Sequence, residues 1–157
     1  MSNLAFRNVE VAPDDPVSVW PTEAIQTTLE RGGLSDWRQL AVAVRTHPWG
    51  AVARRIEEVL RYSRPYGVSE LMERVIDRAR VDAERAERGA VAQEVGDLLE
   101  RAGLSRREFA SRIGTSTSRL STYATGKVTP SAALMVRMRA EAEAAGELDP
   151  KHSRRAI

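Results

Sequence analysis

The chain has 157 residues, with no cysteine, 42% apolar residues and only 5% aromatic residues. This length allows one core of ordinary size or two small helical units, packed mainly from Ala, Val, Leu and Ile. The lack of cysteine excludes disulfides and thiolate metal sites and fits a reducing cytosol. No apolar run approaches the ~20 residues of a membrane span, and the N-terminus lacks a basic-then-apolar signal pattern. We therefore expect a soluble, cytoplasmic protein with no membrane partner.

The positive charge of the chain is concentrated in one segment. The net charge is only +2, but residues 101–139 carry eight basic side chains and a single acidic one, Glu108. The segments on either side are each net negative. Such a block is typical of a surface that binds a polyanion, although a solvated face that happens to exclude acids is the alternative.

Residues 1–19 contain Pro13-Asp14-Asp15-Pro16 and no periodic apolar pattern, which predicts an irregular or mobile arm. Residues 20–88 read as a helical region, because Gly and Pro clusters separate stretches with apolar residues at helical spacing. We expect four helices in this region. The first covers residues 20–31, the second follows a cap at Ser35, the third covers 49–62, and the fourth runs from Ser69 to a break at Gly89.

The last of these helices carries a narrow apolar stripe, spaced alternately by four and three residues. Its members are Met72, Ile76, Ala79, Ala83, Ala86 and Ala90. The stripe could form a homodimer seam, or it could pack within its own chain against the preceding helices. The three tryptophans, Trp20, Trp37 and Trp49, favour core packing over a stacking platform for nucleic acid, since their region is otherwise poor in aromatics and net acidic.

Catalytic and metal-binding patterns are not found. His47 and His152 have no ligand-like neighbour at helical spacing, so no metal site is expected. Glu57 and Glu58 lie among arginines, which indicates surface ion pairing and not an acid/base dyad. Without a phosphate-binding glycine loop or a nucleophile elbow, we expect no enzymatic activity and no cofactor.

The sequence of residues 89–146 predicts four short helices, and residues 147–157 are expected to form a polar tail. The first covers 91–102; the second follows a capping box formed by Ser105 and Glu108 and ends at Ile113. A tight turn at Gly114-Thr115 leads to a third helix over 117–124, and Ser131 caps the fourth. Two short helices joined by a glycine-containing turn form the helix-turn-helix pattern.

The segment from Ala102 to Ser131 resembles the Xre/Cro family, which has the fold of lambda-type repressors. The positions that carry the resemblance are Gly103-Leu104-Ser105, Ala110, Gly114, Ser116, Leu120, Ser121, Tyr123, Gly126-Lys127 and Thr129-Pro130-Ser131. Arg106 and Thr117 depart from the glutamines common in the family, and Ala124 departs from its glutamate. Residues 146–157 are too short and polar for the family's usual fifth helix, so the long helix before Gly89 or a second subunit could cover that surface.

The outer face of the third helix is suited to base edges in a major groove, because Leu120 and Tyr123 anchor its other face. We expect base contacts from Thr117, Ser118, Arg119, Ser121 and Thr122. The resemblance implies phosphate contacts from Arg106, Arg107, Ser116, Lys127 and Thr129.

The sequence thus predicts an all-α protein, with an N-terminal helical region and a C-terminal lambda-repressor-like helix-turn-helix domain. The expected function is sequence-specific binding of double-stranded DNA by a homodimeric transcriptional regulator, in the manner of a bacterial repressor. The alternative is an antitoxin-like protein: residues 20–88 would bind a partner protein such as a toxin, and the DNA-binding domain would autoregulate the operon.

Overall fold

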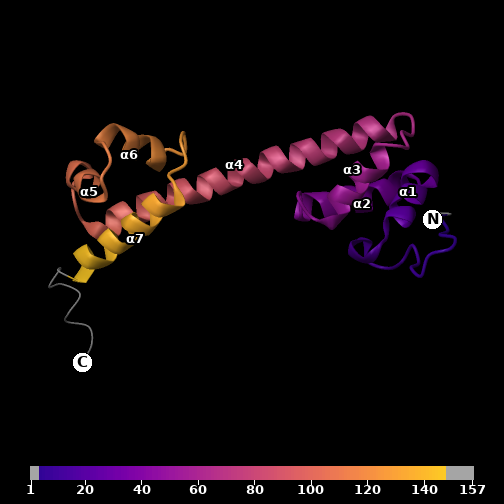
Figure 1. Cartoon of the computed structure of the whole chain (residues 1–157), viewed down its shortest axis with the longest axis horizontal. Coiled ribbons are helices and arrows are strands. Elements are labelled where there is room, and N and C mark those ends of the chain that lie inside the picture. Colours follow the sequence, from indigo (N-terminus) through magenta and orange to yellow (C-terminus); the bar gives the residue numbers. More distant parts are fainter. Residues whose placement is uncertain (1–3, 148–157) are drawn as a thin grey trace, which may run out of the picture. The chain divides into compact units, whose positions relative to one another are not determined.

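The computed structural model describes residues 4–147, which fold entirely into helices, turns and irregular segments (Figure 1). No strand occurs within this range, which confirms the all-α prediction. The elements in order are η1 (Val17–Val19), α1 (Thr22–Arg31), α2 (Leu34–Thr46), α3 (Ala51–Leu60), α4 (Val68–Ala102), α5 (Arg106–Ile113), α6 (Thr117–Ala124) and α7 (Ala132–Glu147). None of these helices has the length and apolar character that a membrane crossing needs.

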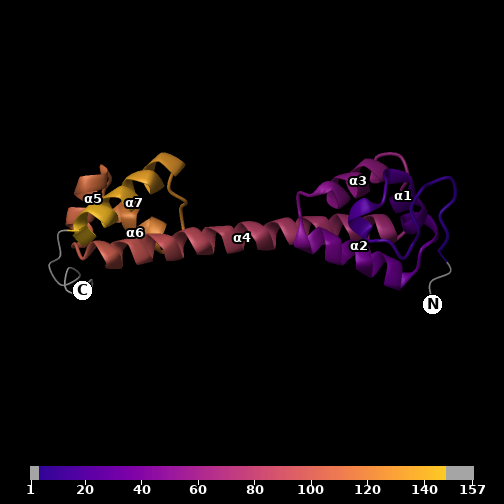
Figure 2. The same ribbon diagram turned by 90° about the horizontal axis from the view of Figure 1, so that it is seen from below.

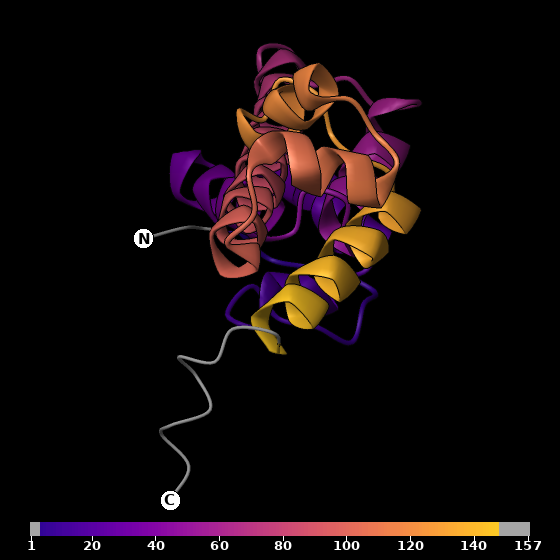
Figure 3. The same cartoon turned by 90° about the vertical axis from the view of Figure 1, so that its left-hand side faces the viewer.

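The chain divides into two compact units, Met1–Glu84 and Arg85–Ile157. The first holds η1, α1, α2, α3 and the beginning of α4 (Figure 2). The second holds the end of α4 together with α5, α6 and α7 (Figure 3). Each unit has its own core of buried apolar side chains, so each can be described by itself.

The core of the first unit is built around Trp20, which is fully buried in the segment between η1 and α1. Its ring meets that of Phe6 edge to face, with 4.9 Å between centroids, and its indole N–H donates to the Asp15 carbonyl. Residues 4–16 of the predicted arm are irregular, as expected, but its last residues form η1, and Phe6 and Val11 pack against this core.

The tryptophans do not share one environment. Trp37 is half-buried against the core and donates its indole N–H to the Thr28 carbonyl at 3.0 Å. Trp49 is 47% exposed, so the expectation of core packing was wrong for this residue. It lies in the turn before α3 begins, and its side chain does not join the inward face that starts at Val52.

The start of α2 also differs from the prediction. The helix begins at Leu34, and Ser35 lies inside its first turn instead of capping it. The carboxylate of Asp36 accepts a hydrogen bond from the Gly33 N–H at 2.8 Å, and Asp36 is buried. An acidic side chain near a helix N-terminus also interacts favourably with the helix dipole.

The predicted break at Gly89 is absent, because α4 continues through this glycine to Ala102. One glycine costs a helix only ~1 kcal/mol relative to alanine, and the neighbours here are Ala, Glu and Arg, which favour helix. The apolar stripe of this helix has two parts. Met72, Ile76 and Ala79 are buried in the core of the first unit, which excludes them from a homodimer seam. Ala86 and Ala90 are exposed.

The core of the second unit fixes the four helices that carry the predicted site. Its fully or nearly fully buried members are Val95, Leu98, Phe109, Ala110, Ile113, Leu120, Met138 and Ala142. Contributions come from α4, α5, α6 and α7, so each helix has one face turned inward. The predicted tail lies outside the described residues except for Glu147, which ends α7.

Candidate nucleic-acid interface

Helices α5 and α6 are joined by a tight turn at Gly114. This glycine has φ +78°, a left-handed conformation that residues with a Cβ rarely adopt. The Thr115 N–H donates to the Ala110 carbonyl at 2.9 Å, which closes the end of α5. The turn redirects the chain at once into α6, whose first residue is Thr117.

The inward face of α6 consists of Leu120, fully buried, and Tyr123, nearly so. Thr117, Ser118 and Arg119 are exposed on the first turn of the same helix. This arrangement presents two hydroxyls and a guanidinium on the first turn of α6, where they are free to meet a groove of DNA.

Ser116 caps α6: its hydroxyl oxygen accepts a hydrogen bond from the Arg119 N–H at 3.2 Å. An oxygen that accepts in this way still has its O–H proton to donate. The exposed Ser116 side chain can therefore serve the helix and a phosphate at once.

Ser121 and Thr122 are less accessible than the first turn of α6. Both are half-buried, and their hydroxyls donate to backbone carbonyls, Ser121 to Thr117 at 3.1 Å and Thr122 to Arg119 at 2.7 Å. Their O–H protons are already used, so only lone pairs remain for a ligand, and the Ser121 oxygen already accepts one hydrogen bond from Arg106. Of the five residues expected to contact bases, these two are the less available as donors.

The cations expected at phosphates flank α6 on both sides. Arg106 and Arg107 occupy the first turn of α5, and Lys127 follows α6 in the loop with Thr129; all four are exposed. The loop is tied to the end of α6, because the N–H groups of Gly126 and Val128 donate to the carbonyls of Tyr123 and Thr122, each at 3.2 Å. Lys127 and Thr129 thus extend from a fixed loop.

Two of the eight basic residues in the 101–139 block are neutralised by acids. Arg112 pairs with Glu108 and with Glu141, each at 2.8 Å. Arg139 pairs with Glu94 at 2.6 Å. The hydrogen bond from Arg139 holds the pKa of the Glu94 carboxyl below its usual value of 4.5, which shows that the carboxylate is stabilised in its charged form.

The remaining cations make no ion pair with any residue from 4 to 147. They are Arg101, Arg106, Arg107, Arg119, Lys127 and Arg137. Arg137 instead donates to the Ile113 carbonyl at 3.3 Å, next to the turn at Gly114. A cation at the C-terminal end of α5 stabilises that helix through its dipole. The uncompensated charge that remains lies mainly at residues expected to face DNA.

One interaction of this unit was misassigned from the sequence, and several others were not predicted. Glu108 does not complete the capping box, because its carboxylate pairs with Arg112, although the Glu108 N–H does donate to Ser105 Oγ. The i,i+4 spacing of Glu108 and Arg112 is visible in the sequence. The contacts of Arg112 with Glu141, Arg139 with Glu94 and Arg137 with Ile113 join distant segments and have no local signal.

Residues 78–140 match a family model described as a helix-turn-helix domain. The match covers under half of the chain and includes the end of α4, α5, α6 and most of α7. The chain therefore carries a C-terminal helix-turn-helix domain of the same general kind as the Xre/Cro proteins. Neither the curated proteins nor the solved structures contain a match to it.

Proposed function

We propose that this protein is a sequence-specific double-stranded DNA-binding regulator of transcription, acting as a dimeric repressor. The observation that carries the proposal is the exposed first turn of α6, with Thr117, Ser118 and Arg119 turned outward. The unpaired cations Arg106 and Lys127 lie on the elements that flank it. Hydroxyls and a guanidinium read base edges, whereas cations at the margins neutralise phosphates.

In the proposed complex, α6 enters the major groove and its first turn faces the bases. Arg119 is the strongest candidate for base recognition, because a guanidinium matches guanine O6 and N7 with two hydrogen bonds. Ser116, Arg106, Arg107, Lys127 and Thr129 hold the phosphates on either side. Thr117, Ser118, Ser121 and Thr122 make the remaining base contacts, the latter two chiefly as acceptors.

A dimer follows from the size of the recognition element. One eight-residue helix reads too few base pairs to select a site in a genome, so two copies on two half-sites are needed. The half-sites would lie one helical turn apart, ~34–36 Å, or a multiple of it. The exposed alanines Ala86 and Ala90 on α4 are the remaining part of the seam that a second copy could use. Bound at a promoter, such a dimer would block access for polymerase.

The central experiment is selection of duplexes from a random pool by the full-length protein, followed by fluorescence anisotropy on the enriched sequence. We expect an enriched site with two-fold symmetry and an affinity at least ~1,000-fold above that for a scrambled duplex. Recovery of no consensus would contradict the proposal, as would equal affinity for both duplexes. Sedimentation of the full chain, and of the Ala86→Glu Ala90→Glu double variant, tests the dimer seam: the variant should be monomeric.

The antitoxin-like function is the second candidate, and one observation favours it. The first unit exposes the aromatic side chains of Trp49, Tyr62 and Tyr66, and aromatic residues are enriched at protein interfaces. In this case the first unit would hold a partner protein, encoded beside it, while the second unit binds the shared promoter. Co-expression with the product of an adjacent open reading frame, followed by size exclusion, tests it: a stable heteromeric complex supports it, and separate elution contradicts it.

A further inference from the structure

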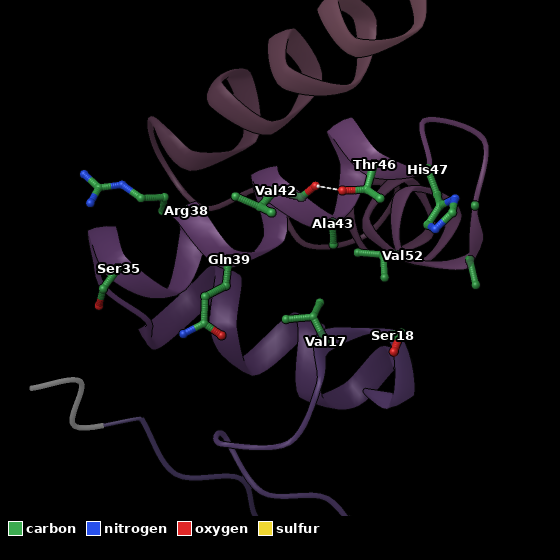
Figure 4. A pocket seen from close by; sticks show the side chains of 12 residues that line it. Val17, Ser18, Ser35, Arg38, Gln39, Val42, Ala43, Thr46, His47 and Val52 are labelled. Atoms are coloured by element: carbon green, nitrogen blue, oxygen red, sulfur yellow. Dashed lines mark hydrogen bonds between the residues drawn. The ribbon is translucent and has the colours of Figure 1, made fainter. Parts of the chain in front are cut away.

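A groove of about 620 Å³ opens on the first unit (Figure 4). One wall is the outer face of α2, where lining residues recur at helical spacing from Ser35 to Thr46. At 1.5 Å per residue this face is about 16 Å long. The opposite side is formed by η1 and by the segment from His47 to Val52. The groove is therefore elongated and walled by three separate segments.

The two facing walls of the groove are apolar in its middle. Figure 4 shows Val17 of η1 facing Val42, Ala43 and Val52 across the groove. Val42 is 53% exposed although it lies in the middle of a helix that packs its other face into the core. An occupant that covered Val42 would remove apolar surface from water, which is favourable in proportion to the area covered.

The polar groups of the groove lie toward its two ends. Gln39 and the exposed Arg38 are near the start of α2, and His47 follows its end (Figure 4). Among the described residues that line the groove none is acidic, and Arg38 makes no ion pair with any residue from 4 to 147. Figure 4 shows the guanidinium of Arg38 directed away from the groove, so its flexible stem must turn inward to bring the permanent positive charge to an anion bound at this end. The charge of the lining therefore favours an anionic ligand and disfavours a cationic one.

We propose that this groove binds a small organic molecule with an elongated apolar body and one anionic group, such as an alkyl carboxylate. The apolar body lies over Val17, Val42 and Val52, and the carboxylate meets the guanidinium of Arg38. The volume falls within the range of ~300–1,000 Å³ that is usual for small-molecule sites, which are largely apolar with a few polar groups that fix orientation. The site is separate from the proposed DNA interface, so it can be tested without DNA.

The test is titration of the ¹⁵N-labelled full-length protein with decanoate, followed by amide chemical shifts. Decanol and decylamine serve as neutral and cationic probes of equal chain length. We expect saturable shifts at residues 17–18, 35–52 and their neighbours, with decanoate the tightest and decylamine the weakest. Shifts elsewhere, or equal affinity for the three probes, would overturn the proposal. The absence of any shift would also overturn it.

Two variants separate the roles of charge and apolar surface. Arg38→Gln should weaken decanoate about two- to fivefold and leave decanol unchanged, since an exposed ion pair contributes little. Val42→Asp should weaken the binding of both ligands at least about tenfold, because it places a charge in the apolar middle of the groove. Val81→Asp is the matched control, since Val81 is 47% exposed on α4 and does not line the groove. If Val42→Asp and Val81→Asp have the same effect, the groove is not the site.

Discussion

The guanidinium Nη1 of Arg106 lies 3.3 Å from the hydroxyl oxygen of Ser121, so the first turn of α5 is tied to the middle of α6. Ser121 donates its own proton to the Thr117 carbonyl and accepts from Arg106. This chain of hydrogen bonds holds a cation beside the proposed recognition helix. Arg107, the next residue, is exposed and makes no ion pair within the described range. The two arginines therefore differ in how firmly they are placed.

The salt dependence of DNA binding should show whether Arg106 and Arg107 each contact a phosphate. Each phosphate neutralised adds ~0.9 to the slope of log affinity against log salt. In a dimer, Arg106→Ala and Arg107→Ala should each lower that slope by about 1.8, since each change occurs twice. Anisotropy isotherms at several salt concentrations measure it. Arg54→Ala, at an exposed position on α3 in the first unit, is the control and should leave the slope unchanged.

Arg119 and Lys127 should separate specificity from affinity. Arg119→Ala should cost about 1–3 kcal/mol for each half-site of the selected sequence and much less on a scrambled duplex, because a base contact is lost in each half-site. Lys127→Ala should weaken both duplexes alike, because a phosphate contact carries no sequence information. Measuring the affinity of both variants for both duplexes tests the two expectations. An equal loss on the two duplexes for Arg119→Ala would show that Arg119 does not read a base.

Gly114 and Gly89 should respond in opposite directions to alanine. Gly114 has φ +78°, so Gly114→Ala should lower the free energy of unfolding of the second unit by about 1–2 kcal/mol. Gly89 lies inside α4 with open space around it, so Gly89→Ala should raise stability by up to ~1 kcal/mol. Urea unfolding followed by circular dichroism measures both. A stabilising Gly114→Ala would mean that the turn between α5 and α6 is not the one described.

Because each unit has its own core, we expect a core mutation to change the unfolding transition of its own unit and not that of the other. All three tryptophans of the chain lie in the first unit, so tryptophan fluorescence reports on that unit, whereas circular dichroism reports on both. Leu120→Ala, at a fully buried position of the second core, should destabilise it by about 2–5 kcal/mol. The dichroism transition should move and the fluorescence transition should not. Ile56→Ala, in the first core, should move the fluorescence transition.

The ion pair of Glu94 with Arg139 should give the second unit a pH-dependent stability. Arg139 lowers the pKa of Glu94 below 4.5, so the stabilisation is fully present above that pH and is lost as the pH falls through the lower, folded-state value. Glu94→Gln should therefore lower the melting temperature at pH 7 and have no effect once the carboxylate of the parent protein is protonated. Glu143→Gln, at an exposed glutamate on α7 that makes no ion pair with a described residue, should have no effect at pH 7.

The sequence by itself determined the helix-turn-helix and the approximate positions of most helices, because the signals for them are local, but it did not show that α4 continues through Gly89. The apolar spacing, the serine caps at Ser105 and Ser116 and the glycine turn at Gly114 each act within a few residues. The exposed first turn of α6 followed in the same way, since burying Leu120 and Tyr123 leaves Thr117 and Ser118 on another face of the helix.

Only the tertiary structure decided which charges and apolar residues remain free, because that depends on partners far along the chain. Glu94 and Glu141 lie outside the basic block and neutralise Arg139 and Arg112 within it. Met72 and Ile76 belong to the same stripe as Ala86, yet the former are buried by α1–α3 and their flanking segments, while the latter is exposed. The sequence reports a side chain's type and its place on a helix, whereas burial and pairing are set by long-range packing.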